Sequence, residues 1–247
     1  MIERLLPNDV AAVEAFRDPA GLPAEYLYPQ EAAVVARAVE KRKREFSTVR
    51  VCARRALSMI GHAPAPLLPD RRGAPIWPTR VTGSMTHCDG YRAAAVAGKG
   101  IVASIGIDAE PNARLPAGVL DLVALADERD CVKQLLDDNP EACWDRLLLS
   151  AKESVFKAWY PLTQSELGFD QARINFACAP GDPTVGTFTA ELLVHDLAAG
   201  GHRLSDFAGK WLCHAGYLVT AVVVRSASHI TKIHRPCTPA EALNCRK

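Results

Sequence analysis

The chain has 247 residues, of which 49% are hydrophobic and 23% are charged, and its formal net charge is +1. This length allows a full hydrophobic core, and this composition excludes a disordered or fibrous chain. The near-zero net charge argues against a general nucleic-acid or membrane-surface binder, because both need an excess of positive charge. We expect a globular protein with no nucleic-acid or membrane partner, in which any polyanion meets a local basic cluster.

The sequence also indicates a cellular compartment. No apolar run approaches the roughly 20 residues that span a bilayer, and the first ten residues include Glu3, Arg4 and a proline in place of a signal-peptide core. The eight cysteines form no Cys-x-x-Cys pair, which is typical of reduced thiols in a cytoplasmic protein, many of them in the core. They stand at positions 52, 88, 131, 143, 178, 213, 237 and 245.

The first half of the chain alternates irregular and regular segments. Residues 1–25 contain several prolines and are expected to be irregular, whereas residues 29–61 carry a helical pattern with a charged middle. Residues 62–80 hold five prolines, which end helices and central strands alike, and this predicts a loop. Apolar runs at 91–97 and 101–107 flank a Gly-Lys-Gly turn, which predicts a hairpin.

The second half is predicted to hold a helix and a sheet. Residues 140–160 carry a helical pattern that Pro161 is expected to end. Residues 172–225 alternate β-branched and polar residues, which predicts strands. Two short segments also resemble each other: a Gly90-Tyr91 step and a Gly216-Tyr217 step each lead into an apolar run. One degenerate repeat is compatible with two related halves or with coincidence.

Two acidic residues end the apolar run at 101–107. Asp108 and Glu110 are two residues apart, so in an extended chain their side chains point to the same face. Like charges so close destabilise each other unless a positive group lies between them. Such a pair suits Mg²⁺, which prefers oxygen ligands and takes others from substrate phosphates. A solvated loop after a strand is the alternative interpretation.

The helix predicted over 140–160 carries a polar side. Ser150, Glu153 and Lys157 lie opposite an apolar stripe, and Glu153 and Lys157 are four residues apart. On an isolated helix this would be a surface ion pair worth roughly 0.3–0.5 kcal/mol. Because Leu149 and Phe156 flank the polar side, we interpret it as a half-buried site.

Basic residues are the third feature. Arg50 and its basic neighbours give the 29–61 helix many cations, and Arg71 and Arg72 add more in the loop. A charge run is usually a solvated face, and a phosphate site requires these groups to converge, which spacing cannot show. The small residues around Thr86 and His87 would let backbone N–H groups approach a phosphate, although a lone histidine is more often structural.

Several catalytic motifs are absent. The sequence contains no P-loop and no dinucleotide-binding turn, no nucleophile elbow and no kinase signature, and no zinc-ligand spacing. Any phosphate chemistry therefore uses another scaffold.

The motifs around the singled-out residues resemble those of one known family. GIDAE at 106–110, followed by SAKESVFK at 150–157, resembles the paired signature of the 4′-phosphopantetheinyl transferases. REFxxxRxxAR at 44–54, RRGAPIWP at 71–78 and GSMTHCDGY at 83–91 are similar to the supporting motifs of its single-chain, pseudodimeric branch. The resemblance covers roughly residues 40–225. It departs at Leu149, a packing position where many members carry an aromatic residue.

The resemblance implies an α+β fold. It consists of two structurally similar α/β halves, a pseudo-dimer, with the active site in the cleft between them. We expect an N-terminal half over residues 1–108, a C-terminal half over 109–225 and a weakly structured tail over 226–247. The Gly-Tyr repeat would then mark equivalent places in the two halves. A chain that supplies both halves is expected to act as a monomer.

The resemblance also implies an activity. It is Mg²⁺-dependent transfer of 4′-phosphopantetheine from coenzyme A to a serine of an acyl, aryl or peptidyl carrier protein, with release of adenosine 3′,5′-bisphosphate. Such enzymes activate polyketide, nonribosomal-peptide, fatty-acid or siderophore synthases. Asp108, Glu110 and Glu153 would hold Mg²⁺, for which Mn²⁺ is a possible substitute, and Glu153 and Lys157 would be catalytic. The residues implied to bind coenzyme A are Arg42, Arg50, Arg71, Arg72, Thr86, His87, Asp108, Lys152 and Lys157.

Two other functions are compatible with the same residues. A metal-dependent nucleotide phosphodiesterase needs the carboxylates but no protein acceptor. A non-catalytic module that binds coenzyme A or a nucleotide needs only the basic residues. The role of Glu153, as base or as metal ligand, is also open at this point.

Overall fold

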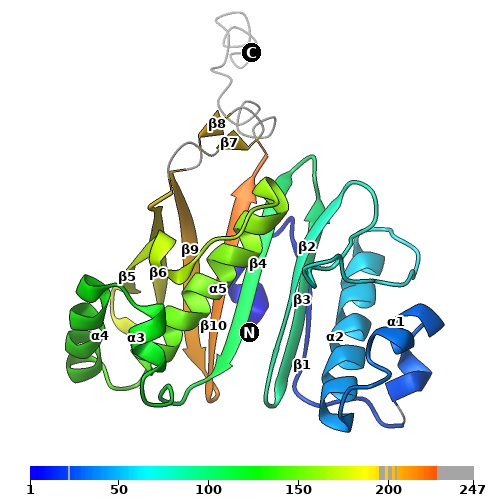
Figure 1. Ribbon diagram of the computed structural model, residues 1–247, viewed down its shortest axis with the longest axis horizontal. Coiled ribbons are helices and arrows are strands. Elements are labelled where there is room, and N and C mark those ends of the chain that lie inside the picture. The colour runs from blue at the N-terminus through cyan, green and yellow to red at the C-terminus, as the bar shows by residue number, and fades with distance from the viewer. Residues whose placement is uncertain (22, 195–197, 200–201, 204, 227–247) are drawn as a thin grey trace, which may run out of the picture.

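The computed structural model describes residues 1–21, 23–194, 198–199, 202–203 and 205–226. Two main antiparallel sheets stand side by side, each packed against one long helix (Figure 1). This architecture confirms the α+β class expected from the sequence. All but the first residue of the tail expected over 226–247 lies outside the described residues.

The elements are the following, in chain order: η1 (Ile2–Leu5), β1 (Ala11–Ala15), η2 (Pro23–Tyr26), α1 (Pro29–Val34), α2 (Glu40–Met59), β2 (Val81–Cys88), β3 (Tyr91–Gly98), β4 (Val102–Pro111), α3 (Val119–Val123), α4 (Ala126–Asp138), α5 (Trp144–Thr163), η3 (Phe169–Gln171), β5 (Ala172–Ala179), β6 (Asp182–Leu192), β7 (Ala198–Ala199), β8 (His202–Arg203), β9 (Asp206–His214) and β10 (Tyr217–Arg225).

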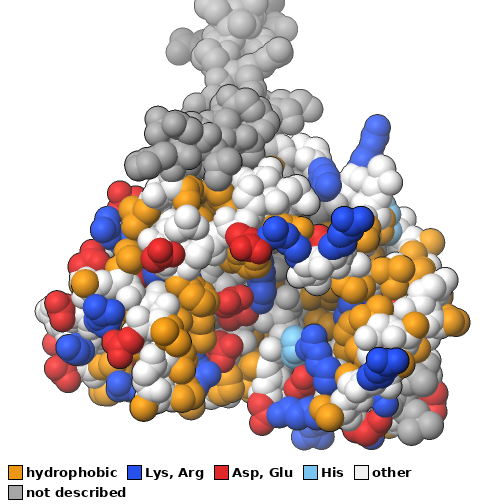
Figure 2. Space-filling model, viewed as in Figure 1, with side chains coloured by type: hydrophobic (Ala, Val, Ile, Leu, Met, Phe, Trp, Pro, Cys, Tyr) orange, Lys and Arg blue, Asp and Glu red, His pale blue; other side chains and the backbone are white. Residues whose placement is uncertain are grey.

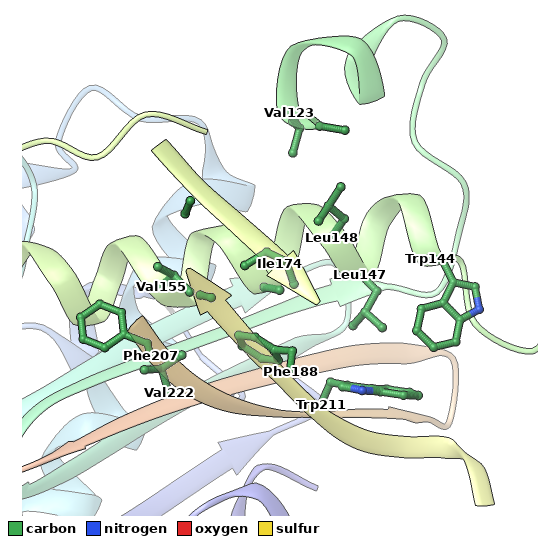
Figure 3. Close-up of a cluster of buried hydrophobic side chains, with 14 of the residues drawn as sticks. Val123, Trp144, Leu147, Leu148, Val155, Ile174, Phe188, Phe207, Trp211 and Val222 are labelled. Carbon is green, nitrogen blue, oxygen red and sulfur yellow. The ribbon is translucent and has the colours of Figure 1, made fainter. Parts of the chain in front are cut away.

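The smaller sheet has the order β1–β3–β2 and packs against α2. The larger sheet has the order β4–β10–β9–β6–β5, and α5 crosses its face with α3 and α4 beside it (Figure 1). Trp144, Leu147 and Val155 of α5 are fully buried against Phe188 and Trp211 of the sheet (Figure 3). This core fixes α5 on the sheet, so its remaining faces are available for other contacts.

The two sheets meet along β2 and β4, where side chains replace a backbone ladder. The N–H of Ile107 donates to Ser84 Oγ and the N–H of Ala109 donates to Thr86 Oγ1, each at 3.1 Å. The hairpin predicted from the runs at 91–97 and 101–107 is therefore wrong, since β3 and β4 belong to different sheets. β3 already has β1 and β2 on its two edges, so the chain crosses to the other sheet.

The Gly-Tyr repeat marks two hairpins of the same kind. β2 and β3 turn at Asp89-Gly90, and β9 and β10 turn at Ala215-Gly216. Gly90 and Gly216 have φ angles of 77° and 82°, a left-handed conformation that favours glycine in two-residue hairpin turns. The rings of Tyr91 and Tyr217, which follow the turns, lie 5.4 Å apart between their centroids.

Several boundaries differ from the sequence-based prediction. The opening segment expected to be irregular contains η1, β1 and η2, and the single helix expected over 29–61 is two helices, α1 and α2. α5 continues past Pro161 to Thr163, because a proline in the last turn removes only one backbone hydrogen bond. Gln164 then ends the helix with a left-handed φ of 56°, while its backbone N–H still donates to the Tyr160 carbonyl at 2.8 Å. The expected boundary after Asp108 falls inside β4.

Two further expectations concern the burial of the cysteines and the absence of a membrane-spanning segment. The six cysteines of the described residues are free, but only Cys52 is buried and both Cys131 and Cys178 are exposed. Cys88, Cys143 and Cys213 are half-buried and pack against the core clusters, so the prediction that many cysteines lie in the core is confirmed in part for the described residues. Cys237 and Cys245 lie outside the described residues. None of the helices in the described part of the chain is long and apolar enough to cross a membrane.

Candidate active site

Both carboxylates singled out in the sequence lie on β4. This strand covers Val102–Pro111, so Asp108 and Glu110 are inside it and their side chains share one face, as their spacing predicts. Thr220 and Leu218 of β10 are their ladder partners. The two acidic side chains are therefore held by a strand that is paired along its length, rather than by a solvated loop.

Gly106 lets α5 approach β4 closely. A Cβ atom at this position would lie 1.8 Å from the Ser154 carbonyl oxygen and 2.7 Å from the Ala158 nitrogen. No side chain fits there, so the contact requires glycine. Ser104 Oγ adds a hydrogen bond of 2.7 Å to the Ala158 carbonyl. This close packing brings the polar residues of α5 next to Asp108.

Asp108 is buried and only partly hydrogen-bonded. Its Oδ1 accepts hydrogen bonds from the Lys157 ammonium at 2.7 Å and from the Thr86 hydroxyl at 3.2 Å. Its Oδ2 is buried without a partner among the described residues. A buried carboxylate oxygen without a partner carries a desolvation cost. This atom therefore marks a place where a donor or cation would be stabilised.

Glu110 has a cation of its own. Its Oε2 accepts a hydrogen bond of 2.9 Å from Arg146, which also donates to the carbonyls of Ala113 and Arg114. Burial and the charge of Asp108 raise the pKa of the Glu110 carboxyl above its ordinary value, and Arg146 opposes this. Lys157 and Arg146 thus supply the positive charge that neighbouring carboxylates require.

Glu153 adds a third carboxylate from α5. Burial raises the pKa of Glu153, Lys157 opposes this, and Asp108 and Glu110 raise it further. As placed in the described part of the chain, no three acidic, histidine or cysteine side chains form a group that could hold a metal ion. Lys157 pairs with Asp108 and Arg146 pairs with Glu110, so two of the three carboxylates already have a cationic partner. The donor set is all oxygen, which suits a hard cation such as Mg²⁺.

A pocket of about 740 Å³ lies between α2, the 69–77 segment, β2 and α5, and its lining includes Glu153 and Lys157 but neither Asp108 nor Glu110. Figure 2 shows acidic and basic side chains gathered near the middle of one face of the molecule. Carboxylates and cations that share a space suit a polyanion together with a metal ion. The cationic and histidine residues of the pocket lining are Arg42, Arg50, Arg72, His87, Lys99 and Lys157.

His87 lies on β2 between opposite charges of α2. Its Nε2 is hydrogen-bonded to Arg42 and lies 3.6 Å from the Glu45 carboxylate. Burial, together with the positive charges of Arg42 and Lys157, lowers the pKa of His87 to about 4. The imidazole is therefore neutral at neutral pH and accepts from Arg42, whose other N–H groups can meet an anion.

Two family sequence models match this chain. One, described as the 4′-phosphopantetheinyl transferase N-terminal domain, matches residues 30–97, and the other, described as the 4′-phosphopantetheinyl transferase superfamily, matches residues 104–208. Together they cover more than half of the sequence. The chain belongs to the 4′-phosphopantetheinyl transferase superfamily.

Curated relatives agree with this assignment. The transferase Svp of Streptomyces mobaraensis is 55% identical over 224 residues, which are 91% of this chain and 89% of the relative. Npt of Nocardia iowensis is 48% identical over 90% of this chain and 99% of its own length. PptT of Mycobacterium tuberculosis is 43% identical over 88% and 93%. All three are named 4′-phosphopantetheinyl transferases, and the chain is an enzyme of this transferase class.

Thr86 supports Asp108 in the transferase and does not line the pocket. Its hydroxyl accepts from the Ala109 N–H and donates to Asp108, which fixes the orientation of that carboxylate. Residues 82–87, whose N–H groups are expected to approach a phosphate, belong to strand β2, which pairs with β3 and forms the edge of the smaller sheet.

Besides Arg42, three arginines are expected to bind coenzyme A, and they differ in their surroundings. Arg50 lines the pocket but is buried, donates to the Leu67 carbonyl at 3.2 Å and lies 3.1 Å over the Phe46 ring. Burial lowers the pKa of Arg50 to about 10, so it stays charged at neutral pH. Arg72 lines the pocket and its side chain is half exposed, whereas Arg71 is exposed and is not part of the lining.

Lys152 departs from expectation. Its ammonium is buried and donates to the Glu128 carboxylate at 2.6 Å and to the Phe169 carbonyl at 2.7 Å. It lines the second pocket, of about 490 Å³, together with Arg72 and Glu153, and is absent from the lining of the 740 Å³ pocket. Ser150, expected on the polar side of the helix, is buried against Thr220 of β10, with 3.0 Å between the hydroxyls.

Three residues of the site region were missed from the sequence. Arg146 shares a helix face with Glu153 and Lys157 at helical spacing, so the pattern of α5 could have indicated it. Asp70 and Tyr160 could not be paired in advance, because their 2.9 Å hydrogen bond joins residues 90 positions apart. This bond ties the proline-rich loop to α5 across one end of the pocket.

Proposed function

We propose that this transferase moves 4′-phosphopantetheine from coenzyme A to a serine hydroxyl of an acyl, aryl or peptidyl carrier protein. The serine oxygen forms a bond to the phosphorus that carries pantetheine, the diphosphate bond breaks, and adenosine 3′,5′-bisphosphate leaves. The observation that carries the proposal is the buried, unpartnered Oδ2 of Asp108 beside a pocket lined by cationic side chains.

Asp108, Glu110 and Glu153 would hold Mg²⁺, with Mn²⁺ as a possible substitute. Their oxygens are the hard donors that this cation prefers, and Oδ2 of Asp108 is buried without a hydrogen-bond partner among the residues that the structure describes. When bound, the cation would neutralise charge on the diphosphate and on the transferring phosphoryl group.

The basic side of the pocket would bind the phosphates of coenzyme A. Arg42 and Arg72 carry guanidinium groups at the pocket, and His87 accepts a hydrogen bond from Arg42. Charge-assisted hydrogen bonds from guanidinium to phosphate are among the stronger polar contacts in proteins. Arg50 would contribute its charge from the pocket wall, and Arg71 would act from outside the lining.

Glu153 is proposed as the base. A serine hydroxyl is a poor nucleophile near neutral pH, so a carboxylate that takes its proton accelerates the attack. Glu153 and Phe156 line both the main pocket and a second one of about 490 Å³, which gives the serine and pantetheine room on either side. Lys157, held by Asp108, would protonate the leaving phosphate oxygen.

The two sheet-and-helix regions are proposed to be the two halves of a pseudo-dimer, with the pocket as the cleft between them. α2 and β2 supply one wall and α5 the other, so one chain completes the site and a monomer suffices. The targets we propose are carrier proteins of polyketide, nonribosomal-peptide, fatty-acid or siderophore synthases in the cytoplasm.

Mass spectrometry of an apo carrier protein incubated with the enzyme, coenzyme A and Mg²⁺ tests this function. We expect a mass gain of one phosphopantetheine, absent from a carrier whose acceptor serine is replaced by alanine. Release of free phosphopantetheine without carrier modification would indicate a phosphodiesterase. Coenzyme A binding without turnover on any apo carrier would indicate a binding module, and either result would refute the proposal.

A further inference from the structure

One ion pair of the transferase is almost completely removed from solvent. The side chains of Lys152 on α5 and Glu128 on α4 are 1% and 3% exposed, and their charged atoms are 2.6 Å apart. The ammonium also donates to the Phe169 carbonyl at 2.7 Å. A buried pair of this kind is stable only when both partners are hydrogen-bonded, and breaking it leaves an uncompensated charge.

Glu128 has further partners of its own. Its Oε2 accepts from the Leu125 N–H and its Oε1 from the Ile174 N–H, both at 2.7 Å. The carboxylate therefore joins the start of α4 and the start of β5 to Lys152 on α5. Within the described residues, each of its oxygens already has a partner, unlike Oδ2 of Asp108.

Lys152 immediately precedes Glu153 on α5. Neighbouring residues of a helix point about 100° apart, so fixing Lys152 toward α4 and β5 also fixes the direction of Glu153. Glu153 borders the main pocket, and Lys157, one turn further along, reaches Asp108 at 2.7 Å. The rotation of α5 about its axis thus couples the buried pair to the pocket side chains.

We propose that Lys152 is a positioning residue, which acts with Glu128 to hold α5 in the rotation that aims Glu153 and Lys157 at Asp108. Lys152 does not contact coenzyme A in this proposal. To reach a phosphate its ammonium would have to leave Glu128 buried and unpaired. The inference rests on the proposed function, because it assigns an effect on phosphopantetheine transfer.

The test uses three variants of the full chain: Lys152→Met, Glu128→Gln and the double variant. We measure kcat and KM for coenzyme A in the carrier assay, and coenzyme A affinity by calorimetry. Lys152→Met should lower kcat about 10- to 100-fold, as a misplaced catalytic group does. Coenzyme A affinity should stay within about threefold, because the groups that bind coenzyme A are unchanged. Glu128→Gln should show the same split of a reduced kcat and an unchanged affinity.

The double variant separates positioning from direct binding. Removing both charges leaves no uncompensated charge, so Glu128→Gln should restore part of the kcat that Lys152→Met loses. If Lys152 bound a phosphate directly, a change at position 128 could not replace the missing ammonium. Lys133→Met, at an exposed lysine of α4 that lies 3.8 Å from the Asp130 carboxylate, is the matched control and should behave as wild type.

Three results would overturn the proposal. The first is coenzyme A affinity at least about tenfold weaker in Lys152→Met but unchanged in Glu128→Gln. The second is a double variant whose fold-loss in kcat equals the product of the losses of the two single variants, which would mean that the two residues act independently. The third is wild-type kcat in both single variants. If a single variant does not fold, a double variant that folds and transfers still supports the pairing, and one that folds without transferring contradicts it. A wild-type enzyme that transfers nothing would refute the proposed function itself, which distinguishes the two failures.

Discussion

The two walls of the pocket come from different sheets and carry different chemistry. The wall made by α2, β2 and the proline-rich loop presents arginines and His87. The opposite wall is made by α5 and presents Glu153 and Lys157, and Lys157 pairs with Asp108 of β4, which lies behind the lining together with Glu110. A diphosphate needs the first set of groups and a divalent cation needs the second. The proposed binding of coenzyme A with a divalent cation therefore draws on residues of both sheet-and-helix units.

The walls also differ in how completely their charges are satisfied. On the α2 side, Glu31 is fully buried and accepts hydrogen bonds from Arg54 and from the Leu67 N–H, and Arg50 packs on Phe46. On the β4 side, Oδ2 of Asp108 is buried without a hydrogen-bond partner among the described residues, and the same is true of Nε of Arg92 on β3. Satisfied buried charges hold a structure together, whereas an unsatisfied one is explained best by a ligand. This difference separates supporting residues from candidate binding residues.

The largest effect is expected from the unsatisfied carboxylate. Asp108→Asn should reduce transfer by on the order of 10³-fold, the scale for losing a group that stabilises transition-state charge. The fold should survive, because one of three neighbouring carboxylate charges is removed and Thr86 can still hydrogen-bond the amide. Carrier modification by mass spectrometry and Mn²⁺ binding by calorimetry measure the two losses.

Asp121→Asn, at a largely exposed aspartate of α3, is the control for Asp108→Asn and should retain transfer and Mn²⁺ binding. Full activity of Asp108→Asn would contradict the assignment of this carboxylate. Undiminished wild-type activity in excess EDTA would contradict the divalent cation.

Glu153→Gln should lower kcat about 10²- to 10⁴-fold, the range for a lost general base. Gln keeps the shape and one ligating oxygen but cannot take the serine proton. Coenzyme A affinity should stay near normal at saturating Mg²⁺, because the pocket cations are unchanged. Single-turnover rates at rising Mg²⁺ measure the effect. Recovery of more than about half the wild-type rate at high Mg²⁺ would show that Glu153 acts mainly as a ligand.

The acidic wall was the more predictable of the two from sequence. The two-residue spacing of Asp108 and Glu110 indicates a shared strand face, and helical spacing places Glu153 and Lys157 together. Both are local periodicities, so they do not depend on how the sheets pair. The partner of β4 is not local, which is why the expected hairpin with β3 is wrong and β10 pairs there instead.

The basic wall was predictable only in part. The sequence shows that Arg42, Arg50 and Arg72 are cationic, but their roles depend on burial and on partners distant in the chain. Arg50 is packed on Phe46, and Lys152 pairs with Glu128 across 24 positions. Side chains that pair across such long stretches of sequence produce no periodic pattern. The composition of the sequence therefore cannot distinguish an arginine or lysine that stabilises the fold from one that binds a phosphate.

Arginine replacements on the basic wall sharpen this distinction. Arg42→Ala and Arg72→Ala should each weaken coenzyme A binding by about 1.5–3 kcal/mol, the range for a hydrogen bond to a charged group. Dephospho-coenzyme A should lose less with whichever arginine touches the 3′-phosphate. Arg50→Ala should chiefly reduce the free energy of unfolding, because it removes a buried charge near Glu31.

Calorimetry and urea unfolding of the three arginine variants measure these effects side by side. Arg37→Ala, at an exposed position between α1 and α2, is the control and should change neither quantity. Unchanged coenzyme A affinity in both Arg42→Ala and Arg72→Ala would show that these arginines are solvated surface residues that do not bind coenzyme A. If Arg50→Ala weakened coenzyme A binding but left the free energy of unfolding unchanged, the role of Arg50 in supporting the fold would be contradicted.

The smallest effect is expected from His87, which lies where the two walls meet. Burial and the charges of Arg42 and Lys157 lower its pKa to about 4 in the folded protein, from an ordinary value of 6.5. Between these pH values the unfolded chain binds more protons than the folded one, so stability falls as pH falls from 6.5 toward 4. Above pH 6.5 both states are neutral at this site and the contribution is constant.

His87→Gln should therefore flatten the pH dependence of the free energy of unfolding between pH 4 and 6.5. The full pKa shift would correspond to about 3 kcal/mol, but the side chain is 33% exposed, so solvent screening reduces the expected difference to about 1 kcal/mol. Urea unfolding at pH 4.5, 5.5 and 7 measures it, with the exposed His214→Gln as control. Parallel curves for wild type and His87→Gln would mean that His87 is not held neutral. A flattened curve would show that the folded protein holds this imidazole neutral, as its burial and the neighbouring charges of Arg42 and Lys157 predict.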